Sequence, residues 1–263
     1  MDILKRGLAP ISAEAWSEID EKAAEVLKSR LSARKAVKVD GPKGWDYTVI
    51  PEGRLILKED EKDVKTGVFQ VKPLVEARAS FTLNRWEMDN VARGARDIDL
   101  DNLEEAVRKI AEFEENAVYK GYEAGNIQGL DQSTAHNIIP FGNDDQAIMD
   151  ALSEGVVTLK EHYVEEAFTL IVGKEAYKRL HKKSQGYPLV KRIESLLGGK
   201  VLYSTVVEGA YLIPYNHDDL EFTIGQDFSI GYEGHDDKEV RLFITETFTF
   251  RVLDENIIIK YRV

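Results

Sequence analysis

Residues 241–252 read RLFITETFTFRV and show the cleanest two-residue alternation in the chain. Apolar side chains occupy one set of alternate positions, namely Leu242, Ile244, Phe248, Phe250 and Val252. The intervening set is mostly polar, with Arg241, Thr245, Thr247, Thr249 and Arg251. Because successive side chains of a strand point to opposite faces, this pattern predicts a strand with one packed face and one polar face.

Glu246 falls on the apolar face of this predicted strand. An unpaired carboxylate would be costly there, since burial removes its hydration. We therefore expect Glu246 to have an arginine partner or to contact another subunit.

Two long amphipathic helices are predicted upstream. Apolar residues recur at helical spacing over 13–32, with acidic residues and Lys28 on the opposite side. A second helix is predicted over 101–123, where Asp101 is suited to cap the helix and Glu104 to complete a capping box. Five carboxylates of this second helix spread around its polar side and predict a solvated face: Glu104, Glu105, Glu112, Glu114 and Glu115.

Residues 49–71 predict two strands joined by a highly charged tip at 58–67. A two-stranded ribbon is marginally stable alone in water. This hairpin has little of its own to bury, so we expect it to lie on another surface, such as that of a neighbouring subunit.

The segment 127–219 contains shorter alternating elements and predicts a mixed α/β subdomain. The expected helices cover 144–162, 174–182 and 189–197, and the expected strands cover 168–172, 200–207 and 210–214. The chain after residue 220 is predicted to be mostly strand.

Composition limits the function classes. The 263 residues include no cysteine, which excludes disulfides and thiolate metal sites and fits a reducing compartment, with the cytoplasm as the default location. A net charge of −12 disfavours nucleic-acid binding. The sequence shows neither a signal-peptide pattern nor an apolar run of the roughly 18 residues that a membrane helix needs, so no membrane partner is expected.

Motifs for common catalytic chemistry are missing from the sequence. It has no phosphate-binding loop, no G-x-S-x-G elbow, no G-x-G-x-x-G turn and no zincin or di-iron histidine spacing. The acidic run DIDLD at 97–101 resembles the start of a calcium loop. However, Asn102 stands where the glycine is needed and Arg108 where the bidentate glutamate is needed, so no metal site is predicted.

Several stretches together resemble one family. They are LKR at 4–6, AP at 9–10, GPKGW at 41–45, FTLNRWE at 81–87, EFE at 112–114, YPL at 187–189, GQD at 225–227, SIGYE at 229–233 and RLFITETFTF at 241–250. In order and spacing they resemble encapsulin of the small-shell type, the shell protein of bacterial and archaeal nanocompartments, essentially end to end.

This resemblance implies an α+β fold, that of tailed-phage major capsid proteins. The N-terminal helix and arm at 1–48 would belong to a peripheral domain, followed by an extended loop at 49–71. The peripheral domain would continue over 72–126 with the long spine helix and return as strands over 220–263, and an axial domain would occupy 127–219.

The resemblance also implies a function. The protein would be a non-enzymatic subunit of an icosahedral shell of at least sixty copies, with pores for ions and small molecules. The shell would enclose a ferritin-like iron oxidase or a dye-decolourising peroxidase, held by a C-terminal targeting peptide. The alternative reading is a soluble flavin-binding or hydrolytic enzyme of unrecognised class.

Three groups of site residues follow from the resemblance. The cargo peptide would contact Leu27, Leu31, Arg34, Val39 and Ile230. A flavin, as FMN or riboflavin, would stack on Trp86 with Arg78 as a polar partner. A pore at the five-fold axes would be framed by Ser184, Gln185, Gly186 and Tyr187.

Overall fold

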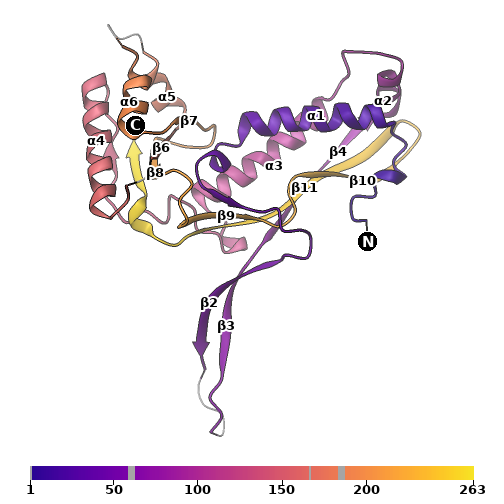
Figure 1. Cartoon of the computed structure of the whole chain (residues 1–263). Helices are drawn as coiled ribbons and strands as arrows, with labels where there is room; N and C mark the ends of the chain where they lie inside the picture. Colours follow the sequence, from indigo (N-terminus) through magenta and orange to yellow (C-terminus); the bar gives the residue numbers. More distant parts are fainter. Residues whose placement is uncertain (1, 59–62, 166, 183–186) are drawn as a thin grey trace.

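The computed structural model describes residues 2–58, 63–165, 167–182 and 187–263. These residues form a five-stranded sheet with two long helices, a second five-stranded sheet with three shorter helices, and a hairpin that projects from the body (Figure 1). Short 3-10 turns at Arg6–Leu8, Ala33–Lys35, Glu123–Gly125 and Glu255–Ile257 connect these parts.

The long strand β11 (Glu239–Val252) is the centre of the first sheet. Strand β4 (Val75–Asn84) pairs antiparallel along one of its edges. Strands β10 (Ser229–His235) and β9 (Leu220–Ile224) share its other edge, one after the other. The short strand β1 (Lys38–Asp40) adds to β9 in parallel. The strand predicted from the alternation at 241–252 is therefore confirmed. Three other strands of the sheet pair with it.

The apolar face of β11 packs as predicted, but its second face is not simply polar. Thr245 and Thr249 are fully buried, and Phe243 is almost so. Strands flank β11 on both edges, so neighbouring side chains cover its small threonines. The Thr245 hydroxyl donates to the Ala77 carbonyl at 2.8 Å, and the Arg78 guanidinium lies 4.1 Å from the centre of the Phe243 ring.

Helices α1 (Ala13–Arg30) and α3 (Asp101–Lys120) cover the apolar face of this sheet, with α3 packed on β4 and β11 and α1 packed on α3. The shorter α2 (Arg85–Ala92) follows β4 directly. The expected capping box of α3 is wrong, because Leu100 occupies the N-cap position without a side-chain cap and Glu104 instead pairs with Lys22 at 3.2 Å. Both long helices end two or three residues earlier than predicted.

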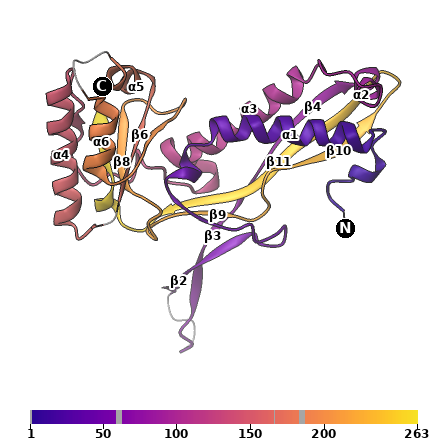
Figure 2. The same cartoon turned by 45° about the horizontal axis from the view of Figure 1, so that its top comes forward.

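The second sheet has the strand order β5 (Ile139–Pro140), β12 (Ile259–Arg262), β8 (Ala210–Pro214), β6 (Phe168–Val172) and β7 (Val201–Tyr203). Helices α4 (Asp145–Glu161), α5 (Lys174–Leu180) and α6 (Leu189–Leu197) pack around it (Figure 2). Strand β7 is shorter than the predicted 200–207. The C-terminal strand β12 belongs to this second sheet, which is formed mainly by residues 127–219. The sequence-based domain boundaries instead place all of 220–263 in the domain of the first sheet.

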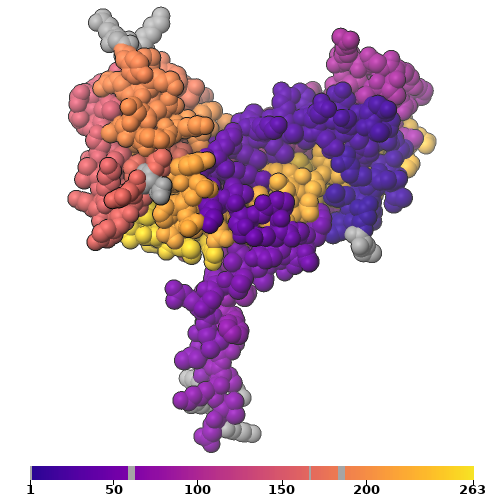
Figure 3. All heavy atoms as spheres, in the orientation of Figure 1, coloured from indigo at the N-terminus to yellow at the C-terminus, as the bar shows by residue number. Residues whose placement is uncertain are grey.

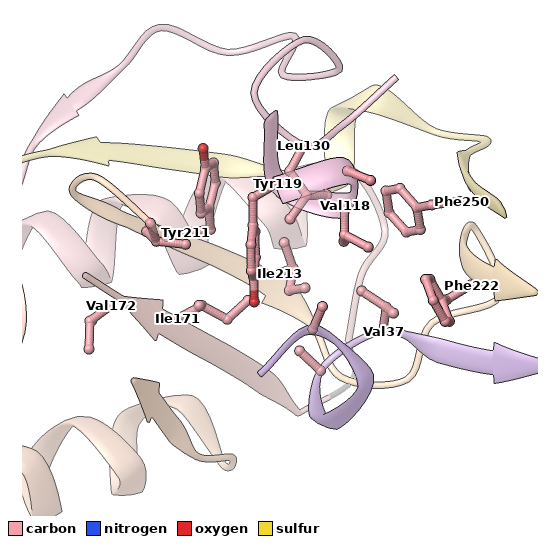
Figure 4. Packing of buried hydrophobic residues seen from close by; sticks show 14 of the residues in the cluster. Val37, Val118, Tyr119, Leu130, Ile171, Val172, Tyr211, Ile213, Phe222 and Phe250 are labelled. Carbon is pink, nitrogen blue, oxygen red and sulfur yellow. The ribbon is translucent and has the colours of Figure 1, made fainter. Parts of the chain in front are cut away.

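One continuous apolar core joins the two sheets. Tyr119 at the end of α3 stacks on Tyr211 of β8, with ring centroids 5.9 Å apart. Figure 4 shows these two rings beside Ile213 and Val118, with Phe222 and Phe250 of the first sheet nearby. The two sheets are therefore tied through α3.

The hairpin of β2 (Val49–Leu57) and β3 (Gly67–Pro73) projects away from the rest of the molecule in the space-filling view (Figure 3). Leu55 pairs with Phe69 and Ile56 with Val68, so apolar residues occupy both faces of the ribbon. Its exposed large apolar side chains are Val49, Leu55, Ile56, Leu57, Val64, Val68, Phe69 and Val71. The predicted hairpin is confirmed, and within one subunit it is largely uncovered.

Candidate functional site

An ionic cluster connects the N-terminal segment to the first sheet, and we call it the Arg34 cluster: Arg34, Glu114, Asp227 and Glu246. Glu114 and Glu246 are its buried members, whereas Asp227 is partly exposed. Arg34 Nε donates to Glu114 Oε1 at 3.0 Å, and Nη2 donates to Glu246 Oε2 at 2.9 Å. Arg34 Nη1 donates to Asp227 Oδ1 at 2.7 Å. The guanidinium also lies 4.7 Å from the centre of the Phe228 ring. The arginine partner expected for Glu246 is thus confirmed.

Burial controls the protonation of this cluster. Glu114 and Glu246 are fully buried. Desolvation raises the pKa of both carboxyls, and the neighbouring Glu114 charge raises the pKa of Glu246 further. Within this cluster, Arg34 is the one positive charge shared by three carboxylates.

Glu115 anchors the same segment from the next position of α3. Its carboxylate accepts from the backbone N–H groups of Ser32 and Ala33, each at 2.8 Å, and from the hydroxyls of Ser32 and Ser204. Desolvation nevertheless raises its pKa to about 7. The predicted solvated face is therefore wrong for Glu114 and Glu115. They continue the buried stripe of α3 that includes Val107, Ile110 and Ala111.

Most of the residues predicted to bind the cargo peptide lie around this cluster. Leu27 is half-buried near the end of α1, and Leu31 and Ile230 are buried. Val39, on the edge strand β1, pairs with Phe222, whose ring centre is 5.3 Å from the Arg34 guanidinium. Ile230 lies on β10 opposite Ile244 of β11, whereas Val39 is aligned through Phe222 with Phe250, six residues further along β11. Among them Val39 is the exposed one.

Arg34 already has ionic partners within the chain. Its side chain is 15% exposed and its donors are already directed at three carboxylates. The structure therefore gives Arg34 a stabilising role, while peptide binding by the five residues stays a prediction.

The two predicted flavin contacts lie apart in one subunit. Trp86 is exposed in the first turn of α2, and the guanidinium of Arg93 lies 5.6 Å from its ring centre. Arg78 lies on β4 and pairs with Glu76 at 2.8 Å. Six residues of extended strand, roughly 20 Å, separate Arg78 from the end of β4. Flavin binding by Trp86 and Arg78 stays a prediction.

The predicted pore residues Ser184, Gln185 and Gly186 lie outside the described residues. Tyr187 is described and is exposed just before α6. In the described part of the chain, no group of three or more His, Asp or Glu side chains is suited to hold a metal ion. No described helix is both long and apolar enough to cross a membrane.

Comparison with known proteins decides the family. The Linocin_M18 family, described as "Encapsulating protein for peroxidase", matches residues 1–249. A type 1 encapsulin shell protein of Rhodospirillum rubrum is 37% identical over 262 residues, covering 96% of this chain and 94% of that protein. The chain belongs to the encapsulin shell family. Encapsulin shell proteins are structural, and membership makes this chain a self-assembling shell subunit.

Solved structures confirm the capsid-like fold of this encapsulin. The virus-like particle from Pyrococcus furiosus matches with a TM-score of 0.70 at 15% identity, covering 94% of this chain and 99% of that chain. The capsid of an empty GTA particle matches with a TM-score of 0.58 at 14% identity, covering 88% and 96%. The predicted α+β capsid fold is thus confirmed, and the alternative of a soluble enzyme is not favoured.

Two members of the Arg34 cluster, and the neighbouring Phe228, are not predicted by the sequence patterns of this encapsulin. Glu114 was assigned to the solvent, and Asp227 and Phe228 were not considered as neighbours of Arg34. The helical period would have placed Glu114 on the buried stripe, four residues after Ile110. The contact with the 225–228 turn depends on tertiary folding and leaves no local signal.

Proposed function

We propose that the chain closes into an icosahedral shell of at least sixty copies around a cargo enzyme. The projecting hairpin carries this proposal. Leu57 and Phe69 are each 75% exposed, and a ribbon that is apolar on both faces requires a partner surface. Head-to-tail contacts between identical subunits that close on themselves provide such a surface for every copy.

We expect loss of shells when the hairpin becomes charged. Leu57→Asp combined with Phe69→Asp should abolish assembly, because each carboxylate would have to be buried against a neighbour. Both side chains are exposed within the subunit, so the fold itself should persist. Size-exclusion chromatography and negative-stain microscopy measure the particle, and circular dichroism measures the fold.

The matched control is Leu57→Met with Phe69→Leu, which keeps both positions apolar and should assemble. Uniform hollow particles from the doubly charged variant would show that the hairpin is not an assembly contact. A wild-type protein that runs as a monomer or small oligomer would refute the shell itself.

The cargo proposal rests on the region around Val39. The family description names a peroxidase, which favours that cargo over a ferritin-like iron oxidase. An extended targeting peptide suits an edge strand flanked by apolar side chains. Val39 is exposed on the edge strand β1, whereas Leu31 and Ile230 are buried, so it is the residue best placed to meet such a peptide.

Val39→Asp should leave shells intact but reduce cargo loading about tenfold, because one apolar contact of roughly 1–2 kcal/mol is lost and a charge must be buried. Loading is measured as the fluorescence of a targeting-peptide fusion that co-purifies with particles. The control is Val157→Asp on α4, an exposed valine remote from the Arg34 cluster. Equal loading of both variants would remove Val39 from the peptide site.

We also propose that small molecules enter where residues 183–187 meet at the five-fold axes. Tyr187 supports this assignment, because its exposed ring at the end of that segment is available to line an opening.

A further inference from the structure

The rings of two histidines lie against each other beside the second sheet. His162 is the C-cap residue of α4, and His136 lies in the segment before β5. Their ring centroids are 4.9 Å apart, and the ring planes are inclined at 70°. Both side chains are partly buried, and neither belongs to the Arg34 cluster, the hairpin or the predicted peptide site.

Backbone carbonyls fix the tautomer of each ring. His136 Nε2 lies 2.8 Å from the Asn256 carbonyl oxygen, and His162 Nδ1 lies 2.9 Å from the Thr158 carbonyl oxygen. A carbonyl only accepts, so these two nitrogens carry the hydrogens. In the neutral rings, His136 Nδ1 and His162 Nε2 therefore keep their lone pairs, and neither bonds to a described residue.

Each ring has one feature that is common among metal-binding histidines, namely a ring nitrogen on a backbone carbonyl. A ligating imidazole usually donates its other N–H to a carbonyl or carboxylate, which orients the ring and raises its basicity. With a metal–nitrogen distance of about 2 Å, two imidazoles on one tetrahedral ion have ring centres about 5 Å apart. The observed spacing of 4.9 Å agrees with this value.

We propose that His136 and His162 together bind one divalent transition cation that prefers imidazole, such as Zn²⁺ or Cu²⁺. Water would complete the coordination, since the described residues offer no third His, Asp or Glu suited to the site. The ion would link the end of α4 to the segment before β5 and, through Asn256, to the 3-10 turn Glu255–Ile257.

Copper binding tests the site directly. Tag-free protein titrated with CuCl₂ should bind one ion per chain, and electron paramagnetic resonance should show coupling to two imidazole nitrogens. Zn²⁺ should bind more weakly than Cu²⁺, as the order of affinities for divalent metals requires. His136→Ala and His162→Ala should each weaken binding at least tenfold, and the double variant should lose little more, because the two rings hold one ion.

His181, the C-cap residue of α5, provides a matched control. Its Nδ1 lies 2.9 Å from the Tyr177 carbonyl oxygen four residues earlier, the same local arrangement as in His162. Its ring stacks on Tyr177 at 4.0 Å instead of meeting a second histidine. His181→Ala should therefore leave the Cu²⁺ dissociation constant unchanged. A dissociation constant within twofold of wild type in either single variant of the pair, or coupling to one nitrogen only, would overturn the proposal.

A second measurement covers the case in which an alanine variant fails to fold. Diethyl pyrocarbonate modifies free imidazoles, and mass spectrometry locates the modified residues in wild-type protein. ZnCl₂ should protect His136 and His162 but not His181. Equal modification of all three histidines with and without ZnCl₂ would overturn the proposal without any variant. Neither measurement depends on shell assembly, so the outcome is separate from that of the proposed function.

Discussion

Arg34→Met is expected to lower the free energy of unfolding by about 3–5 kcal/mol, because it leaves a buried charge without its partner. Glu114 is completely buried and receives two of the Arg34 donors, Nε and Nη2. Methionine fills a similar volume but supplies no charge. The urea midpoint of unfolding, followed by tryptophan fluorescence, measures the effect.

Two companion variants separate loss of charge from loss of volume. Adding Glu114→Gln to Arg34→Met should restore part of the stability, because the unpaired charge is removed. Arg6→Met is the matched surface control: Arg6 pairs with Asp20 at 2.7 Å and lies 3.9 Å from the centre of the Trp16 ring, but it is more exposed. Surface pairs contribute at most about 1 kcal/mol. Equal effects of Arg6→Met and Arg34→Met would refute the stabilising role of the cluster.

Stability is expected to fall as the pH rises from about 5 towards 8. The folded pKa of Glu115 is about 7, above its model-peptide value of 4.5, so between these values the folded state binds more protons than the unfolded state. The stabilisation is complete below the unfolded value and is lost as the pH passes the folded value. A shift of this size corresponds to roughly 3 kcal/mol. The raised pKa values of Glu114 and Glu246 act in the same direction.

Unfolding by urea at constant ionic strength, repeated from pH 5 to pH 8, measures this slope. Glu115→Gln should flatten the profile, since the amide does not titrate in this range. Glu105→Gln on the same helix is the control, because Glu105 is exposed and its pairing with Lys109 lowers its pKa, which places its titration below this range. Stability that rises with pH over this interval would contradict the assignment of Glu115.

Local sequence patterns predicted most of the helices and strands but not which residues pack against them. The alternation at 241–252 predicted β11, and its one misplaced carboxylate predicted an arginine. It did not identify Arg34, which is more than two hundred residues earlier, because periodicity reports which face is buried and not what packs against it. Because periodicity does not identify packing partners, it also did not predict that β12 pairs with strands of the second sheet.

The sequence-based predictions were also wrong about which glutamates are buried. Glu114 and Glu115 were assigned to solvent because glutamates usually are, whereas here Arg34 and the backbone of Ser32 and Ala33 compensate their desolvation. The predicted cargo and flavin sites depend on residues from different elements, and local periodicity does not report the distance between them. Within the first sheet, Arg78 lies on β4 opposite Thr245, six residues before the end of that strand.

The position of β11 also sets the order of events during synthesis. The first sheet cannot close until residues 239–252 leave the ribosome, because β4, β9 and β10 all pair with that strand. The apolar hairpin emerges first, and at 5–20 residues per second it waits roughly 10–40 s for the sheet to complete. Nascent subunits translated side by side on one messenger RNA therefore expose this apolar ribbon before either subunit is finished. Timely folding of the last strands, or a chaperone that shields the ribbon, keeps premature contacts from trapping incomplete chains.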